Sequence, residues 1–263
     1  MGDDAFGATR LGLAGGVRAC LFDLDGVLTR TAKIHASAWK MTFDTFLHAY
    51  DRRTGHNDAH FDADADYENY VDGRTREDGI RSSIASRGID VPEGDPDDEP
   101  GTESVRGIAE EKQWTFMSLL EQHGPQVYEG SVRYVKAARE AGLACAVVTS
   151  SENCAAILQA AQIAELFDAT VDGHDVSALN LRGKPSPDSY LAGAKALGVD
   201  PAQAAVFEDA LSGVEAGHAG GFGTVVGVDR IGGEHSGHLR RHGATIVVKD
   251  LSELLGVDAG AGT

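Results

Sequence analysis

The sequence predicts an α/β fold, in which a doubly wound, mostly parallel, Rossmann-like sheet core carries an inserted helical domain. Short apolar or β-branched runs alternate with helix-like segments, and uninterrupted apolar runs are typical of strands that are buried on both faces. One stretch, from Asp51 to Ser104, breaks this alternation and differs in composition from the rest of the chain. The alternation therefore predicts the sheet, and the interruption predicts the insertion.

The candidate strands are short and leave room for helices between them. In chain order they are VRACLFD at 17–23, LACAVVTS at 143–150, ATVDG at 169–173, AAVFED at 204–209, FGTVVGV at 222–228 and TIVVK at 245–249. Helix-like segments lie among them at 131–141, 153–161, 187–197 and 210–218. Because a parallel connection needs a crossover, this order favours a parallel sheet with helices on both faces.

The inserted stretch is strongly acidic. Between Asp51 and Ser104 there are 16 acidic residues, 6 arginines and no lysine, which gives 6 − 16 = −10 of the total charge of −18. Its segments HFDADADYENY and VPEGDPDDEPG are expected to be solvated loops that flank helices at 76–87 and 107–123. We interpret the stretch as part of a separate helical module.

The overall charge excludes several classes of partner. With 23 basic and 41 acidic residues, the chain lacks the basic surface that nucleic acids and anionic membranes require. No run approaches the roughly 18 apolar residues of a membrane helix, and the N-terminus has no basic stretch followed by an apolar core. The three cysteines form no C-x-x-C pair and lie among apolar neighbours, so we expect free, buried thiols. A cytoplasmic protein is the expectation.

Two carboxylates follow the first candidate strand. Asp23 and Asp25 are two positions apart, and Gly26 directly after them allows the chain to turn. In an extended chain, side chains at positions i and i+2 point the same way. Both carboxylates are therefore expected to reach one centre.

Later strand ends supply groups that bind anions. Thr149, Ser150 and Ser151 end the second candidate strand just before a helix, where free backbone N–H groups and the helix dipole favour an anion. Lys184 lies in a loop that Pro185 and its neighbouring proline stiffen. Because the carboxyl ends of parallel strands meet at one edge of the sheet, these groups are expected to converge with Asp23.

A second acidic pair completes the candidate site. Glu208 and Asp209 end the fourth candidate strand, and with Asp23 and Asp25 they place four carboxylates at one edge. Such a group is stable only when a hard cation compensates its charge, and Mg²⁺ is the natural candidate. Mg²⁺ with Lys184 and hydroxyl donors suits phosphoryl transfer, with one carboxylate free to attack phosphorus.

These motifs, in this order, resemble those of the haloacid dehalogenase superfamily. The segments that carry the resemblance are Asp23-Leu24-Asp25-Gly26-Val27-Leu28-Thr29, then Thr149, then Lys184, then Glu208-Asp209. The β-phosphoglucomutase-like branch is indicated by Thr31, His35, Trp39, Gly73-Arg74-Thr75-Arg76-Glu77-Asp78, Ser151 and Asn153. The resemblance covers nearly the whole chain and implies a catalytic core at 1–32 and 129–263, with a helical cap inserted at 33–128.

The resemblance also implies roles for the core residues. Asp23 corresponds to the nucleophile and Asp25 to the general acid and base. The Mg²⁺ ligands are implied to be Asp23, the main-chain carbonyl of Asp25, Glu208 and Asp209. The transferring phosphoryl group is implied to bind Thr149, Ser150 and Lys184.

Other residues are implied to bind the substrate. These are Thr31, His35, Trp39, Gly73, Arg74, Arg76, Lys112, Ser151 and Asn153. Arg76 is the candidate for a second, distal phosphate, because its fork can grip phosphate bidentately. It could instead be a surface ion-pair partner of Glu77 or Asp78. His35 either couples cap movement to Asp25 or faces solvent.

The resemblance implies an enzyme that acts on a small phosphorylated sugar, and a monomer is the expectation. Its expected reaction interconverts β-D-glucose 1-phosphate and glucose 6-phosphate through an aspartyl-phosphate and glucose 1,6-bisphosphate. Glu152, where the branch often has a basic residue, and Gln113, where Asn is more usual, leave the substrate open. The alternatives are a Mg²⁺-dependent sugar-phosphate phosphatase and, from another class, a catalytically silent binding domain.

Two further clusters are not expected to bind metal. Asp62, Asp64 and Asp66 resemble the start of a calcium loop, but Tyr67 stands where that loop needs glycine. The histidines of the stretch 235–242 have no cysteine or carboxylate at a suitable spacing and are expected to lie on a solvated helix face.

Overall fold

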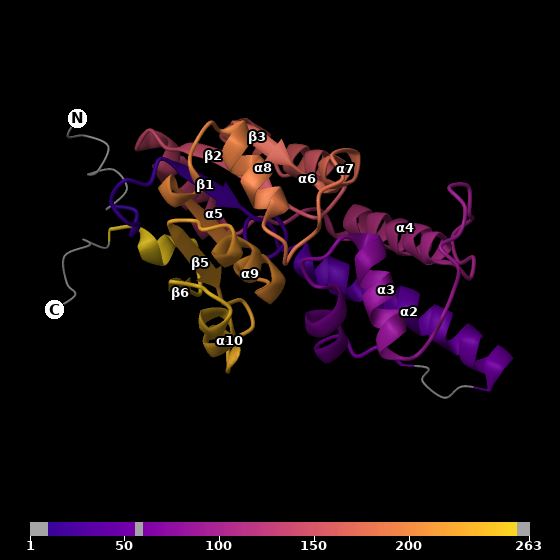
Figure 1. Ribbon diagram of the computed structural model, residues 1–263. Coiled ribbons are helices and arrows are strands. Elements are labelled where there is room, and N and C mark those ends of the chain that lie inside the picture. Colours follow the sequence, from indigo (N-terminus) through magenta and orange to yellow (C-terminus); the bar gives the residue numbers. More distant parts are fainter. Residues whose placement is uncertain (1–9, 56–59, 257–263) are drawn as a thin grey trace. The chain divides into compact units, whose positions relative to one another are not determined.

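The computed structural model describes residues 10–55 and 60–256 and divides the chain into two compact units (Figure 1). One unit comprises Met1–Arg30 and Pro125–Thr263, and the other comprises Thr31–Gly124. The sequence places the limits of the insertion at residues 33 and 128, and the structure places them at 31 and 124. The first residues of the N-terminal segment considered above lie outside the described part.

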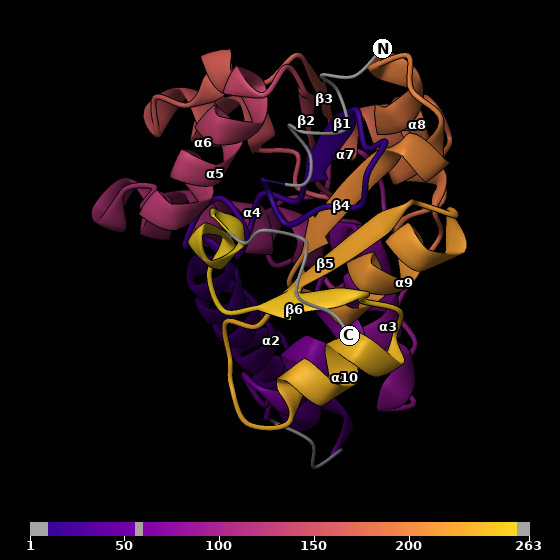
Figure 2. The same cartoon turned by 90° about the vertical axis from the view of Figure 1, so that its left-hand side faces the viewer.

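The first unit contains a six-stranded parallel sheet (Figure 2). Its strands are β1 (Ala19–Phe22), β2 (Ala144–Val148), β3 (Ala169–Val171), β4 (Ala204–Glu208), β5 (Thr224–Val228) and β6 (Ile246–Val248). They lie in the order β3-β2-β1-β4-β5-β6, with every neighbouring pair parallel. This confirms the doubly wound sheet, and each strand lies within its predicted run.

The strand order locates the site. The chain moves outward from β1 to β3 on one side and then returns to place β4 on the other side of β1. Phe22 at the end of β1 is in register with Val147 of β2 and Phe207 of β4. In open α/β sheets, ligands bind at the carboxyl ends of the strands where the winding direction switches. Here that point lies between β1 and β4.

Helices cover both faces of this sheet. They are α5 (Glu129–Glu140), α6 (Cys154–Ala160), α7 (Gly173–Ala178), α8 (Asp188–Ala196), α9 (Leu211–Ala219) and α10 (His235–Arg241), with 3₁₀ turns η2 (Ala164–Leu166), η3 (Pro201–Gln203) and η4 (Leu251–Leu254). On one face, Tyr190 of α8 and Val214 of α9 join the core cluster of Leu21. On the other face, Phe22 packs edge-on against Tyr134 of α5. The strands are buried on both sides, as their continuous apolar runs predict.

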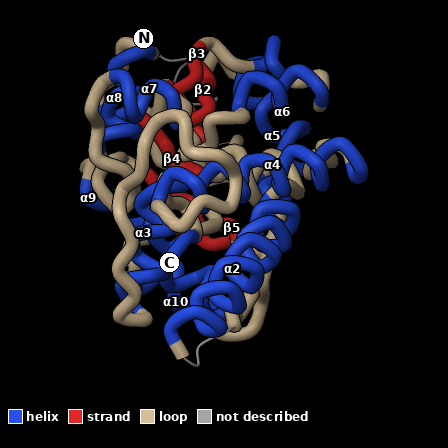
Figure 3. Tube along the Cα trace, turned by 90° about the vertical axis from the view of Figure 1, so that its right-hand side faces the viewer, coloured by secondary structure: helices blue, strands red, loops and turns tan. Residues whose placement is uncertain are grey.

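The second unit is helical (Figure 3). It consists of α2 (Ala32–Thr54), a π-helical turn η1 (Tyr67–Val71), α3 (Arg76–Ser86) and α4 (Val105–His123). In its core, Phe43 stacks between neighbours, 5.4 Å from the ring of Trp39 and 4.8 Å from that of Phe61. Among the described residues, no helix is long and apolar enough to cross a membrane.

The segment predicted as a solvated loop at 60–70 is partly buried. Phe61 is fully buried, and the segment continues into the π-helical turn. Lys40 donates to the Phe61 carbonyl at 3.0 Å, and Arg87 forms an ion pair with Asp66 at 2.5 Å. The acidic residues here bond backbone and basic groups, while Phe61, Tyr67 and Tyr70 pack on the core of this unit. The acidic composition therefore predicted too little burial.

Candidate active site

The centre of the site is a buried lysine between two acids. Lys184 Nζ donates to Asp23 Oδ1 at 2.7 Å and to Glu208 Oε1 at 2.6 Å. Asp23 follows β1 and Glu208 ends β4, so the two acids come from the strands on either side of the switch point. Lys184 also donates to the carbonyl of Val148 at the end of β2, at 3.2 Å. The lysine therefore ties three strand ends together.

Three residues that the sequence did not single out surround the Glu208 carboxylate. The hydroxyl of Tyr190 donates to Glu208 Oε1 at 3.0 Å, and a Cβ atom on Gly213 would lie 1.7 Å from the same oxygen. The backbone N–H of Ala210 donates to Oε2 at 3.0 Å. Tyr190 lies in an apolar helix segment, where a tyrosine normally packs in the core. The sequence therefore carried no signal that its hydroxyl would bind Glu208.

The charges of this group are unbalanced. Burial raises the pKa of Asp23 well above its ordinary value, and Glu208 and Asp25 add to the rise while Lys184 opposes it. Burial lowers the pKa of Lys184, but the two neighbouring carboxylates outweigh it and hold that pKa above its ordinary value. The lysine is therefore charged, and it does not by itself compensate all the acids.

The acids fit a hard cation. Asp23, Glu208 and Asp209 each offer a carboxylate oxygen, and these oxygens all lie within 4.8 Å of one another. Carboxylate oxygens are the ligands that Mg²⁺ and Ca²⁺ prefer. This set could hold a metal ion, and such an ion would relieve the charge imbalance. Asp25, the fourth predicted acid, is half-buried on the turn beside them.

A tight turn carries the first two acids. The N–H of Gly26 donates to the carbonyl of Thr29 at 2.7 Å, and Leu24 accepts from Leu28 at 3.0 Å and from Thr29 at 2.9 Å. Gly26 has a φ of +93°, and a Cβ atom there would lie 1.8 Å from Asp209 Oδ2. Glycine is therefore required both by the turn and by the close approach of Asp209.

The hydroxyl groups lie at the end of β2. Thr149 is buried, and its Oγ1 accepts from the N–H of Ser151 at 3.1 Å. Ser151 Oγ in turn accepts from the N–H of Asn153 at 3.2 Å, directly before α6 begins at Cys154. Ser150 is half-buried between them. Lys184 donates to the carbonyl of Val148, the residue directly before Thr149. The hydroxyl groups therefore lie next to the lysine.

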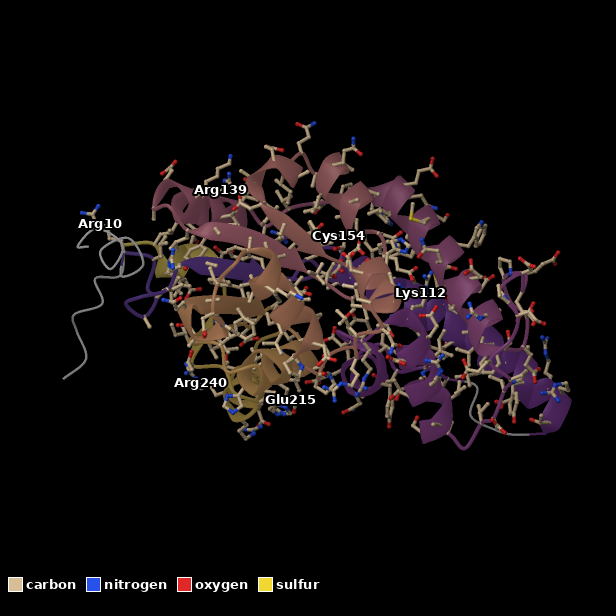
Figure 4. All side chains as sticks on the ribbon, turned by 45° about the horizontal axis from the view of Figure 1, so that its top comes forward. Arg10, Lys112, Arg139, Cys154, Glu215 and Arg240 are labelled. Atoms are coloured by element: carbon tan, nitrogen blue, oxygen red, sulfur yellow. The ribbon has the colours of Figure 1, made fainter. Side chains whose placement is uncertain are left out.

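Candidates in the second unit form two groups. Lys112 Nζ, on α4 (Figure 4), lies 2.7 Å from His35 Nδ1 on α2. The ammonium also lies 5.1 Å from the ring of Trp39 and 4.8 Å from that of Phe116, which stacks on His35 at 4.0 Å. His35 thus faces a protein cluster, and the solvent-facing alternative is wrong.

The second group surrounds Arg76. This residue begins α3, and its Nη1 donates to Gln113 Oε1 at 2.9 Å. Gln113, which replaces the Asn that is more usual in this branch, thus accepts a hydrogen bond from Arg76. Gly73, with a φ of +69°, and half-buried Arg74 form the turn before α3. Thr31, fully buried, precedes α2.

One prediction about histidines needs correction. His235 is 7% exposed, and its Nε2 lies 3.1 Å from the main-chain carbonyl oxygen of Asp209. The expectation of a solvated helix face is therefore wrong at this position. The burial of His235 could not be predicted from the sequence. It depends on contact with Asp209, which follows β4 and is far from α10 in the chain. The thiols of Cys20, Cys145 and Cys154 are free and buried, as predicted.

The fold and site define a phosphoryl-transfer enzyme. A family model described as haloacid dehalogenase-like hydrolase matches residues 17–221, and the chain belongs to this family. The family prediction is thus confirmed. Enzymes of this family generally use Mg²⁺, and the acidic cluster could bind such an ion.

Individual relatives indicate the β-phosphoglucomutase-like branch of that family. The chain is 50% identical to a β-phosphoglucomutase of Mycobacterium bovis over 246 residues, covering 93% of this chain and 94% of the relative. A β-phosphoglucomutase structure from Clostridium difficile gives a TM-score of 0.69 at 23% identity, covering 90% and 93% of the two chains. A mutant of CbbY from Rhodobacter sphaeroides in complex with xylulose-(1,5)bisphosphate gives 0.65 at 26% identity, covering 92% and 97%.

Proposed function

We propose that this chain is a Mg²⁺-dependent β-phosphoglucomutase that interconverts β-D-glucose 1-phosphate and glucose 6-phosphate. The observation that carries the proposal is the buried contact of Asp23 with Lys184, beside the acidic group of Glu208 and Asp209. The 50% identity to the mycobacterial mutase over nearly the whole chain favours a mutase over a phosphatase. The first unit is then the catalytic core and the second is the cap, and we expect a cytoplasmic monomer.

The reaction uses two acids in different roles. In the primed enzyme, Asp23 carries a phosphoryl group, and Asp25 accepts the proton of the substrate's 6-hydroxyl as its oxygen attacks phosphorus. The P–O bond to Asp23 breaks, which gives glucose 1,6-bisphosphate. After the intermediate turns round, Asp23 attacks the phosphorus at C1. Asp25 then returns the proton to the departing sugar oxygen, and glucose 6-phosphate is released.

The surrounding groups stabilise the phosphoryl group in transfer. Asp23, Glu208, Asp209 and the main-chain carbonyl of Asp25 would hold Mg²⁺, which supplies positive charge to the phosphoryl oxygens and to the acids when bound. Lys184 contributes a fixed charge, and the hydroxyls of Thr149 and Ser150 donate to the same oxygens. Asp25 offers only its main chain to the metal, so its side chain stays free to carry a proton.

We assign the remaining candidates to the sugar and its second phosphate. Arg76 binds the distal phosphate with its guanidinium fork, and Gln113 orients that fork. Lys112 adds positive charge next to His35. The other proposed substrate contacts are Thr31, Trp39, Gly73, Arg74, Ser151 and Asn153.

One assay separates the mutase from the phosphatase. The protein is incubated with β-D-glucose 1-phosphate, Mg²⁺ and catalytic glucose 1,6-bisphosphate, and glucose 6-phosphate and free phosphate are measured in the same sample. A mutase gives glucose 6-phosphate, needs the bisphosphate and releases little phosphate. Free phosphate without glucose 6-phosphate would identify the phosphatase. If neither the substrate nor the bisphosphate is consumed, the result would favour the silent binding domain. The α-anomer serves as the control for sugar specificity.

The covalent step has its own test. Asp23→Asn is expected to abolish both isomerisation and phosphate release, because the amide cannot form the aspartyl-phosphate. Asp168→Asn is the matched control, since Asp168 directly precedes β3 and pairs with Arg139 at 2.9 Å, away from the acidic group. Turnover by Asp23→Asn near that of the control would refute the covalent mechanism.

A further inference from the structure

Arg230 has no part in the reaction described above, yet all five of its N–H groups have acceptors. Nε donates to the carbonyl of Gly26 at 2.8 Å, and Nη2 donates to the carbonyl of Val27 at 3.2 Å. The other bonds run from Nη1 to the carbonyl of Lys249 at 2.6 Å and Asp250 Oδ2 at 3.3 Å, and from Nη2 to Ser131 Oγ at 3.2 Å. A guanidinium has five N–H donors in a fixed plane, so this fork is fully used.

The fork bonds the turn that carries the two reacting acids. Gly26 and Val27 directly follow Asp25, and Gly26 also lies against Asp209. The turn's own hydrogen bonds join Gly26 to Thr29 and Leu24 to Leu28, and they leave the carbonyls of residues 26 and 27 to Arg230. Arg230 therefore fixes the turn from outside, one residue after Asp25.

The anchor behind the fork is rigid. The guanidinium carbon of Arg230 lies 3.6 Å from the ring centroid of Tyr128, whose N–H donates to the carbonyl of Leu28 at 2.9 Å. Its carboxylate partner Asp250 fits closely against α5, because a Cβ atom on Gly130 would lie 1.7 Å from Asp250 Oδ1. The side chain of Arg230 is only 13% exposed. Tyr128 and Asp250 therefore hold the guanidinium in place, and the guanidinium in turn holds the turn at residues 26 and 27.

We propose that Arg230 is a positioning residue that sets the orientation of Asp25 for proton transfer. The inference rests on the proposed role of Asp25 as acid and base. In the step concerned, Asp23 forms a bond to phosphorus, the P–O bond to the sugar breaks, and Asp25 gives its proton to the sugar oxygen. Loss of the two carbonyl contacts lets the turn rotate. A shift of about 1 Å costs about 100-fold in rate when alignment is required.

The leaving group distinguishes this role from a structural one. A sugar alkoxide is a poor leaving group and needs the proton from Asp25, whereas p-nitrophenolate leaves without one. For p-nitrophenyl phosphate, kcat/KM reports attack by Asp23 up to release of p-nitrophenolate. For glucose 1,6-bisphosphate, kcat/KM reports the same attack with proton transfer. This first transfer is common to a mutase and a phosphatase, so the comparison holds for either.

The experiment measures both kcat/KM values for Arg230→Lys, which keeps the charge but has only three donors. We expect a fall of about 100-fold for glucose 1,6-bisphosphate and of less than about 3-fold for p-nitrophenyl phosphate. The ratio of the two values does not depend on how much of the preparation is folded, because unfolded protein lowers both equally. Arg139→Lys, on α5 (Figure 4), is the matched control, and its ratio should equal that of the wild type.

A second arm tests whether Arg230 acts through Asp25. In an Asp25→Asn background, Arg230→Lys should change kcat/KM for the bisphosphate by less than about 3-fold, since coupled residues are not additive. Equal losses with both substrates, or full additivity, would overturn the inference. If Asp25→Asn alone leaves the ratio unchanged, the acid–base role in the proposed function fails and the inference fails with it. If Asp25→Asn lowers the ratio and Arg230→Lys does not, only the inference fails.

Discussion

Glu208 and Gly213 are placed so that only glycine fits at the second position. A Cβ atom on Gly213 would lie 1.7 Å from Glu208 Oε1 and 2.0 Å from the carboxyl carbon. The acid cannot move aside freely, because Lys184 and Tyr190 both donate to the same oxygen. Helix α9 can therefore lie directly against the acidic group at the end of β4.

Gly213→Ala is expected to damage the site. Alanine in a helix interior is normally about 1 kcal/mol more favourable than glycine, but here it displaces a proposed metal ligand. We expect a less stable protein whose Mg²⁺ requirement for half-maximal activity rises about 10-fold or more, as is usual when a ligand loses its support. Gly237→Ala is the control, because a Cβ atom there meets only the end of the Arg241 side chain, at 3.2 Å. A more stable Gly213→Ala with an unchanged Mg²⁺ requirement would contradict this.

Tyr190→Phe is expected to lower activity as well as stability. It removes the hydroxyl that donates to Glu208, and a hydrogen bond to a charged group contributes about 1.5–3 kcal/mol. Tyr134→Phe makes the same chemical change at another fully buried tyrosine, whose hydroxyl donates to the carbonyl of Leu11 at 2.9 Å. Urea unfolding should show a loss in both variants. Only Tyr190→Phe should lower kcat, and equal kcat values would show that Tyr190 serves stability alone.

The sheet and the acidic group could be predicted because their signals are local. Each strand is an unbroken apolar run, and parallel strands bring their carboxyl ends to one edge. Asp23 and Glu208, far apart in the chain, therefore had to meet once the strands were recognised. Lys184 does not follow from this rule alone, because it lies in the loop between α7 and α8 and not at a strand end.

The supports of that group could not be predicted in the same way. Tyr190 and Gly213 are ordinary residues for buried helices. Only the packing of α8 against β1, β2 and β3, and of α9 against β4, brings them to Glu208. Arg230 carries no motif, because its acceptors are backbone carbonyls, which every residue has. Phe61 was hidden by the acidic residues around it. Three-dimensional packing, rather than sequence spacing, sets all four positions.

Arg76→Ala is expected to separate isomerisation from simple ester hydrolysis. Arg76 is proposed to hold the distal phosphate, which p-nitrophenyl phosphate lacks, so isomerisation should fall by about 100-fold or more while hydrolysis changes by less than about 3-fold. Arg81→Ala is the control on the same helix, since Arg81 is exposed and pairs with Asp78 and Glu93. Equal losses in both assays would show that Arg76 does not bind a second phosphate. Gln113→Leu should give a smaller loss of the same kind.

The buried thiol of Cys145 is expected to make the free energy of unfolding fall at alkaline pH. Burial raises the pKa of Cys145 from 9.0 to about 12, with a further rise from Asp168. The folded state then binds the proton more tightly than the unfolded state, so this contribution to stability is complete below pH 9 and is lost between pH 9 and about 12. Within that interval the loss is about 1.4 kcal/mol per pH unit. In urea unfolding from pH 8 to 10.5, Cys145→Ala should therefore show a shallower decline than the wild type, after correction for its own packing loss at pH 8. Parallel declines would mean that the Cys145 thiol does not titrate with unfolding.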